Sequence, residues 1–234
     1  MVKSILSLNI IICVILLNSC AGYIYSPTIN LPPEPMKKGE THISAAFETM
    51  PKVNADWYHR TTNAVWVGAK YAIDNNVTLQ GRFWTNLPFT SDDLNGLPIK
   101  YHIFNYTGFS LSSIIMLKKS ETLSYAIIPA YSQVFDMGVS KGQAFALYFA
   151  AWLPQFYILK PYTSFGTGYG SGHFLKNQDG FGLSYHLGFN SEIIKNLNLV
   201  FESYLLWQRN MNANVNELIP GISTGLSFNT DIFN

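Results

Sequence analysis

Charged side chains are scarce in this 234-residue chain: Lys, Arg, Asp and Glu make up 12% of it, against about 25% in ordinary soluble domains. Beyond residue 17 the chain also lacks any apolar run approaching the roughly 20 residues that a membrane-spanning helix needs. Aromatic residues, by contrast, reach 15%. Few charges, many aromatics and no long apolar run together favour strands that alternate in polarity, as the strands of a membrane barrel do.

Cysteine and an excess of basic charge are missing as well. Of the two cysteines, Cys13 lies in an apolar stretch near the N-terminus and Cys20 follows it, so no pair remains for a disulfide or a thiolate metal site. Without residues 1–19 the chain loses one basic residue of its 15, Lys3, and keeps 14 basic against 14 acidic residues. A nucleic-acid partner would require a basic excess. We therefore expect no cofactor, no metal and no nucleic-acid partner.

The N-terminus has the pattern of a signal peptide. Lys3 provides a short positive region and residues 5–17 an apolar stretch that is too short to span a bilayer comfortably. The sequence Leu17-Asn18-Ser19-Cys20 that follows resembles a bacterial lipobox, which implies cleavage before Cys20 and acylation of that residue. The alternative is an ordinary cleaved signal peptide in which Cys20 has no role. We assign residues 1–19 to a lipoprotein signal peptide.

Proline crowds the stretch after Cys20, and proline resists regular strand pairing. This stretch resembles the tether of small lipid-anchored barrels of the Bacteroidota, on the residues Tyr25-Ser26-Pro27, Pro32, Pro33, Pro35 and Lys38-Gly39-Glu40. The resemblance implies an outer-membrane barrel of the porin-like superfamily. It predicts a periplasmic tether over residues 20–39, which begins with the lipidated Cys20, and a barrel over residues 40–234.

From residue 40 onward, apolar and small or polar residues alternate. The clearest case is 181–193, where Phe181, Tyr185 and Leu187 share one face and Ser184 and His186 share the other. This period of two is that of a strand. The same pattern predicts about ten strands, within limits of eight and twelve, near residues 41–49, 63–73, 77–84, 108–117, 122–134, 144–150, 160–170, 181–193, 197–208 and 221–229. The fold class expected is all-β, a transmembrane antiparallel up-and-down β-barrel.

Connections between these strands alternate in length. Short turns are expected at 74–76, 118–121, 154–159 and 194–196, and longer polar loops at 50–62, 87–100, 135–142, 171–179 and 210–217. Outer-membrane barrels place their short turns in the periplasm and their long loops outside. The expected location is therefore the bacterial outer membrane, with the lipid anchor of the N-terminus on the periplasmic side. The long loops are candidate contact surfaces for partner proteins.

A soluble sandwich or lipocalin-like barrel would show the same alternation with its apolar face turned inward. Two features favour the membrane barrel. The face opposite the apolar one is rich in Gly, Ala and Ser and poor in charge, whereas a water-facing surface would carry more Lys and Glu. Aromatic residues also lie near strand ends, as in interfacial girdles. The chain end, residues 228–233, resembles the aromatic last strand that outer-membrane assembly machinery accepts.

The face predicted to line the barrel interior carries charge of both signs. We expect a polar network in the lumen formed by Glu48, Lys70, Arg82, His186, Glu192 and Glu202. Buried charges must be paired, so this set is interpreted first as a structural network that neutralises itself. The alternative is the lining of a narrow pore for ions or small solutes.

His42, Ser44 and Glu48 share one face of the first predicted strand, and a Ser–His–carboxylate set is what acyl transfer uses. The His-x-Ser pair also resembles the lipid A deacylase class of outer-membrane enzymes. However, Glu48 lies six residues from His42, about 20 Å along an extended strand, and cannot orient it. The glycines between Gly166 and Gly170 lack the residues of a phosphate-binding loop and are read as strand.

The expected role is a non-enzymatic outer-membrane barrel lipoprotein with a structural, adhesion or accessory-subunit function. The narrow pore is the first alternative. The second is a lipid-modifying enzyme similar to lipid A deacylases. Membrane lipid and, during biogenesis, the assembly machinery are its expected partners.

Overall fold

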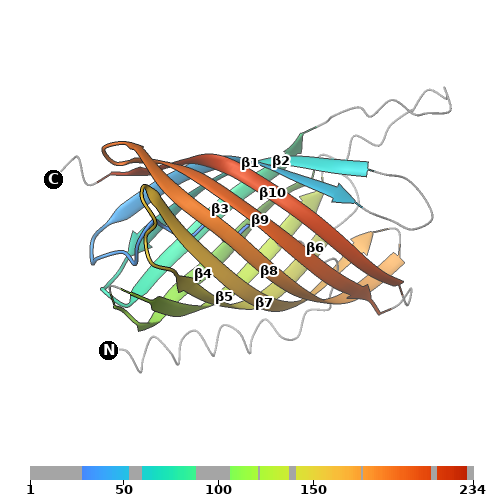
Figure 1. Cartoon of the computed structure of the whole chain (residues 1–234). Helices are drawn as coiled ribbons and strands as arrows, with labels where there is room; N and C mark the ends of the chain where they lie inside the picture. Colours follow the sequence, from blue (N-terminus) through green and yellow to red (C-terminus); the bar gives the residue numbers. More distant parts are fainter. Residues whose placement is uncertain are drawn as a thin grey trace.

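The computed structural model describes residues 28–52, 60–87, 106–120, 122–136, 141–174, 176–211 and 215–230. None of these residues forms a helix long and apolar enough to cross a membrane. Ten strands run through them (Figure 1): β1 (Thr41–Lys52), β2 (Arg60–Ala72), β3 (Val77–Leu87), β4 (Tyr106–Lys118), β5 (Ser124–Asp136), β6 (Lys141–Trp152), β7 (Leu159–Phe174), β8 (Lys176–Ile194), β9 (Leu197–Asn210) and β10 (Val215–Asn229). The expectation of about ten strands is confirmed.

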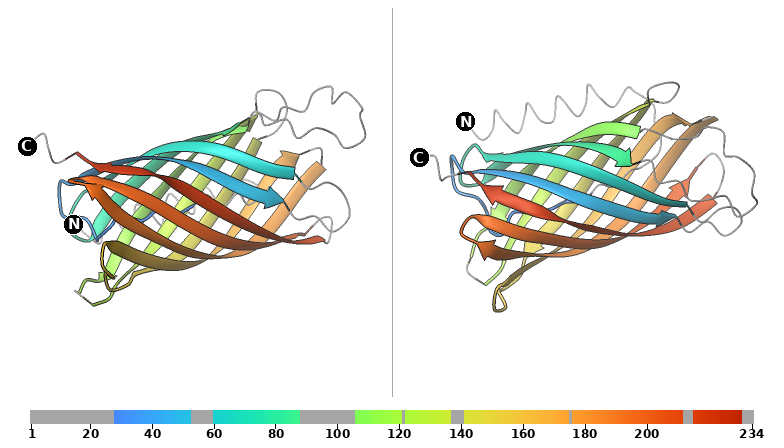
Figure 2. Two further views of the ribbon diagram at one scale, coloured as in Figure 1. Left: turned by 45° about the horizontal axis from the view of Figure 1, so that its top comes forward. Right: turned by 90° about the horizontal axis from the view of Figure 1, so that it is seen from above.

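Every strand pairs antiparallel with its neighbours in the chain, and β1 also pairs with β10, so that the sheet closes into a barrel. Figure 2 shows the closed cylinder from two further sides, with its strands tilted against the axis. Closure removes the open strand edges that would otherwise leave unpaired backbone groups in a bilayer. This is the antiparallel up-and-down barrel that the alternation predicts.

Tight turns gather at one end of the barrel, which we call the turn end (Figure 2). Between β2 and β3 the Asp74 carboxylate accepts hydrogen bonds from the backbone N–H of Asn76 and Val77, at 2.6 and 2.9 Å. Asn196, between β8 and β9, has a φ of +67°, a left-handed conformation that Asn adopts more readily than most residues. The opposite end, where the chain leaves β3 at Leu87 and returns at Tyr106, we call the loop end.

Side chains alternate between the two faces of the wall. On β8, Tyr185 and Leu187 are 52% and 47% exposed, whereas Ser184 and His186 are buried. Large apolar side chains are exposed on the other strands too, among them Ile43, Val67, Phe83, Leu111, Leu147, Phe165, Leu205 and Ile222. A soluble barrel would turn this face inward. The soluble sandwich or lipocalin-like alternative is therefore wrong, and the wall is that of a transmembrane barrel.

Part of the predicted loops is in fact strand. Residues 171–179 were expected as a loop, but the β7–β8 ladder continues to the pairs Gly172–Gln178 and His173–Asn177. The strands β1, β5, β9 and β10 likewise reach into the loops predicted at 50–62, 135–142 and 210–217. Polar residues at these positions mark where a strand leaves the apolar layer rather than where pairing ends. Of the predicted loops, residues 53–59, 88–100, 137–140, 175 and 212–214 lie outside the described residues.

The segment before β1 lies inside the barrel. Residues 28–36, which we call the luminal segment, run back between the strands from the turn end (Figure 1). Residues 28–32 are all buried. Residues 28–32 thus do not form part of the periplasmic tether expected over residues 20–39, whereas Glu34 is exposed and pairs with Lys160 at 2.6 Å. Proline keeps this stretch out of the sheet, and the side chains of the lumen take over the pairing of its backbone.

We expect the folded barrel to resist unfolding by detergent, because its sheet is closed and has no unpaired edge strand. In gel electrophoresis the unheated protein should migrate differently from the boiled protein. Circular dichroism of the unheated sample provides the control for strand content. A single band at the position of the boiled protein, together with solubility in the absence of detergent, would contradict the transmembrane barrel.

Candidate functional site in the barrel lumen

Five of the six residues predicted for the lumen network line the interior. Glu48, Lys70, Arg82, His186 and Glu202 are all buried, and they come from five different strands. The sixth, Glu192, is exposed at the turn end, where its Oε1 accepts a hydrogen bond from the backbone N–H of Asn196 at 3.1 Å. The β8–β9 register shifts between Glu192 and Ile194. Glu192 still pairs with Asn198, whose side chain is buried, so its parity is inward; it is exposed because it lies only two residues from the end of β8, at the rim of the barrel.

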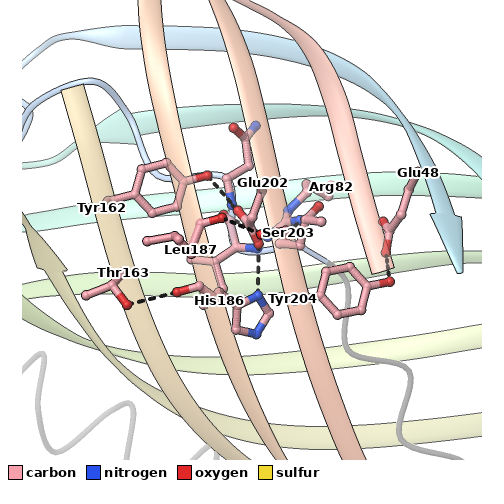
Figure 3. A network of polar contacts seen from close by, with 12 residues as sticks. Glu48, Arg82, Tyr162, Thr163, His186, Leu187, Glu202, Ser203 and Tyr204 are labelled. Atoms are coloured by element: carbon pink, nitrogen blue, oxygen red, sulfur yellow. Dashed lines mark hydrogen bonds and ion pairs between the residues drawn. The ribbon is translucent and has the colours of Figure 1, made fainter. Parts of the chain in front are cut away.

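Glu202 is the centre of the network (Figure 3). Its Oε1 accepts a hydrogen bond from the backbone N–H of Ile29 at 2.8 Å and lies 2.9 Å from Nδ1 of His186. Its Oε2 accepts bonds from the backbone N–H of Asn30 at 2.7 Å and from the Tyr162 hydroxyl at 2.6 Å. Both oxygens of a buried carboxylate are thereby paired, which buried charge requires.

Arg82 binds the carbonyl groups of the same stretch of backbone. Its guanidinium donates to the carbonyl oxygens of Thr28 and Ile29, the second at 3.0 Å. The guanidinium carbon also lies 5.2 Å from the centre of the Trp66 ring, within cation–π range. A carboxylate that accepts the N–H groups and a guanidinium that donates to the carbonyls together satisfy both polar sides of a backbone that turns at Asn30, where φ is +46°.

Further donors follow the luminal segment toward the turn end. Asn190 Nδ2 donates to the carbonyl of Leu31 at 3.2 Å, and Trp152 Nε1 to the carbonyl of Pro32 at 2.9 Å. Lys119, in the turn after β4, donates to the carbonyl of Met36 at 3.0 Å. Partial burial lowers the pKa of the Lys119 ammonium, and the nearby carboxylates of Glu40 and Asp74 oppose that shift.

Apolar packing supports these polar contacts. Ile29 and Leu31 form one buried cluster with wall residues of β4, β5, β6 and β7, namely Ile114, Ala126, Ile128, Tyr148, Ala150, Trp152 and Tyr162. Fully burying one such aliphatic side chain stabilises a fold by about 1.5–3 kcal/mol. The segment is thus held by its side chains on one side and by its backbone on the other.

Large rings make room for the segment by lying against glycine. Tyr162 is the cross-strand partner of Gly188, and Tyr204 is the partner of Gly221. A Cβ atom at either glycine would overlap the tyrosine ring. The pairs Trp84–Gly108 and Tyr148–Gly166 repeat the arrangement. Rings that lie over a glycine stay close to the wall, so the axis of this narrow barrel remains open to a peptide.

A second polar group surrounds Ser44 on β1. Its hydroxyl oxygen accepts hydrogen bonds from Asn30 Nδ2 at 3.2 Å and from Lys70 Nζ at 3.4 Å. Glu48, on the same strand, accepts a hydrogen bond from the Tyr204 hydroxyl at 2.6 Å (Figure 3). The Glu48 carboxylate is thus bonded to β9. Ser44 faces the luminal segment, which covers it from the axis.

Two features predicted from the sequence lie outside the described residues. The signal peptide (residues 1–19) and the lipidation site Cys20 are not among the residues that the structure describes. Within the described part of the chain, no group of three or more His, Cys, Asp or Glu residues is placed to hold a metal ion.

The network predicted from the sequence lacks the luminal segment and three of the side chains that hold it, Trp152, Tyr162 and Asn190. Parity places Trp152 and Asn190 on the inward faces of β6 and β8, and the same parity places Tyr162 on that of β7. The segment also carries a signal of its own: Thr28-Ile29-Asn30-Leu31 alternates like a strand immediately before the first proline pair.

No family model matches this chain, and no curated protein matches it. Solved structures resemble it in shape. The outer membrane protease OmpT from Escherichia coli is 9% identical, with a TM-score of 0.46 over 82% of this chain and 95% of that chain. An outer membrane channel from Pseudomonas putida F1 is 8% identical, with a TM-score of 0.46 over 88% and 100%. The attachment invasion locus protein Ail of Yersinia pestis is 12% identical, with a TM-score of 0.32 over 82% and 99%.

We expect Glu202→Gln to destabilise the barrel. A glutamine offers one acceptor oxygen where four donors now converge, and its amide NH2 would face either the Ile29 N–H or the Asn30 N–H. The loss should be about 2–4 kcal/mol in the free energy of unfolding, measured by urea titration in detergent. Glu192→Gln is the matched control, because Glu192 is exposed and its replacement keeps the acceptor; its effect should stay below about 0.5 kcal/mol. Equal effects of the two substitutions would contradict the central role of Glu202.

Proposed function

We propose that this chain is an outer-membrane β-barrel lipoprotein whose lumen is closed by its own N-terminal segment. In this proposal it has a structural, adhesion or accessory-subunit role and no enzymatic activity. The observation that carries the proposal is the backbone pairing of residues 28–32 with Glu202, Arg82, Asn190 and Trp152. A lumen filled in this way leaves the loops and the lipid-facing wall as the surfaces through which the protein acts.

Closed antiparallel barrels with an apolar exterior are the architecture of the outer membrane, and this supports the proposed location. Short turns at one end and longer connections at the other correspond to the periplasmic and external sides of such barrels. The lipoprotein signal peptide over residues 1–19 and acylation of Cys20 belong to the proposal. So do contact with membrane lipid and insertion by the assembly machinery.

The position of the luminal segment argues against the narrow pore. Ions would have to pass a cross-section that holds a peptide, its paired charges and an apolar cluster. Moreover, Glu202 and Arg82 are engaged with the segment rather than turned toward an open channel, so they are poorly placed to select ions. The observed contacts favour a closed barrel.

Planar-bilayer conductance tests the closed lumen. We expect the refolded wild-type chain to be silent. Replacing residues 28–36 by a Gly/Ser linker of the same length removes Ile29, Leu31 and the prolines, and this variant should show discrete, salt-dependent channels. Heat-dependent gel mobility of both proteins confirms that each has folded. Steady channels of the wild-type protein, with conductance equal to that of the linker variant, would overturn the proposal.

The absence of enzymatic activity has a separate test. Lipid A extracted from cells that express the chain should have the same mass distribution as lipid A from cells with an empty vector, because Ser44 is covered by the luminal segment and bonded to Lys70. Ser44→Ala should change nothing. A loss of acyl chains that depends on expression and disappears in Ser44→Ala would establish the deacylase alternative instead.

A further inference from the structure

The lipid-facing wall of the barrel carries an open groove of about 970 Å³ that reaches from β2 to β8. The large side chains that line it are between 39% and 55% exposed, among them Tyr71, Leu79, Leu111, Leu147, Tyr169 and Phe181. Side chains that face the lumen on the same strands, such as Lys70 and Gln80, are buried. The groove therefore lies on the outside of the barrel, where the wall meets the bilayer.

One bank of the groove is a continuous row of bulky side chains on β4 to β8, strands that follow one another around the wall (Figure 1). Each member of this aromatic row is the cross-strand partner of the next: Leu111, Tyr131, Phe145, Tyr169 and Phe181. The Tyr131 hydroxyl donates a hydrogen bond to Gln133, which lies two residues closer to the loop end. The row thus borders a polar zone, as aromatic belts at membrane surfaces do.

Small side chains lie on the turn-end side of the aromatic row. Ser113, Pro129 and Thr167 line the groove there, and Leu147 separates the last two. Ser113 is only 8% exposed although its neighbour in the row, Leu111, is 55% exposed. An interfacial belt explains the aromatic row but not the small residues beside it, which leave a furrow along the wall.

The furrow runs obliquely through the membrane. Leu111 lies seven residues from the turn-end boundary of β4 at Lys118, whereas Phe181 lies thirteen residues from that of β8 at Ile194. Four strand spacings separate β4 from β8, about 19 Å in all. Because such strands tilt by about 35–45° from the axis, a row across them changes height by about 11–13 Å over this distance. One leaflet of the hydrocarbon core measures about 15 Å, so the furrow matches the depth of one acyl chain.

A cation lies at the loop-end limit of the aromatic row. Arg209 is the cross-strand partner of Phe181 and lies one residue from the boundary of β9 at Asn210. Its side chain is exposed, and it has the outward parity of Leu205, which is 44% exposed. A guanidinium on the outer face at this height meets lipid headgroups, and its fork of donors matches the oxygens of a phosphate.

We infer that the groove binds a phosphate-bearing membrane lipid, with one acyl chain along the aromatic row and the phosphate at Arg209. The inference rests on the proposed outer-membrane location, which makes the loop end the external side and this lipid a member of the outer leaflet. The groove is continuous with the lipid-facing wall, so hydrocarbon is the occupant that reaches it directly. The position of Arg209 adds the charge that complements a phosphate.

Shape and charge, rather than hydrophobic burial, hold the lipid in this groove. The tails of the surrounding bilayer are as apolar as the groove, so transfer of a chain between them gains no hydrophobic free energy. A chain in the furrow contacts the aromatic row on one side and the small residues beneath it, and such dispersion contacts add up. The contact of Arg209 with the phosphate adds charge-assisted hydrogen bonds. The lipid should therefore stay bound when the barrel is extracted into detergent.

Lipid binding by the full-length barrel in detergent tests the site. The folded protein is titrated with dipalmitoyl phosphatidylglycerol, and the retained lipid is counted by native mass spectrometry. Two matched probes divide this lipid into its parts: dipalmitoylglycerol has the chains without the phosphate, and glycerol phosphate has the phosphate without the chains. We expect phosphatidylglycerol to bind about tenfold more tightly than dipalmitoylglycerol, and glycerol phosphate not to be retained.

Three variants locate the bound lipid on the wall. Thr167→Phe fills the furrow and should weaken the binding of both chain-bearing probes about tenfold. Thr224→Phe is the matched control, because Thr224 is exposed on β10 and does not line the groove; it should leave binding unchanged. Arg209→Gln should lower the affinity for phosphatidylglycerol to that for dipalmitoylglycerol. Heat-dependent gel mobility confirms that each variant is folded.

The outcomes separate this inference from the proposed function. Equal lipid binding by Thr167→Phe and Thr224→Phe, or unchanged binding of phosphatidylglycerol by Arg209→Gln, would overturn the inference. So would a wild-type barrel that retains no lipid, or one that forms a dimer which Thr167→Phe dissociates, because the groove would then be filled by protein. These measurements do not depend on whether the lumen is closed, so their failure leaves the proposed function standing, whereas open channels in a planar bilayer would overturn the proposed function alone.

Discussion

The carboxylate of Glu202 joins the barrel wall to the peptide in its lumen, and the other lumen contacts depend on that junction. A buried carboxylate needs donors, and two of the four that surround it belong to consecutive residues of the luminal segment. Arg82 completes the match by donating to carbonyls of the same stretch. A wall with one sign of charge would satisfy half of a peptide backbone; opposite charges on β3 and β9 satisfy both halves.

The width of the barrel is adapted to this peptide by pairs of large and small residues. Four of the aromatic residues that face the lumen, Trp84, Tyr148, Tyr162 and Tyr204, each lie over a glycine of the next strand. Replacing either partner would either block the axis or leave a void beside Ile29 and Leu31. The polar junction at Glu202 and the cross-strand ring–glycine pairs therefore contribute to the same result, which is a lumen shaped to one peptide segment.

Alternation along the chain was enough to predict the strands, the face turned to lipid and five of the six network residues, because the period of two is local. The point at which a strand leaves the lumen is not set by the local period, and that is why Glu192 was misplaced. It pairs with the inward-facing Asn198, yet it lies at the turn-end rim of β8, where its side chain is exposed. The luminal segment was missed for a different reason. Proline content indicates that a stretch will not join a sheet, but it does not indicate where that stretch lies.

Most of the contacts that hold the luminal segment are made to its backbone, and this has a consequence for function. Side chains add to this: Ile29 and Leu31 fill the apolar cluster, and Asn30 donates to Ser44. A lumen that binds a peptide in this manner needs no bound solute to satisfy its charges, so its polar interior is explained without transport. With the lumen occupied by the chain's own segment, the loop end and the lipid-facing wall are the surfaces that remain for contact with other molecules.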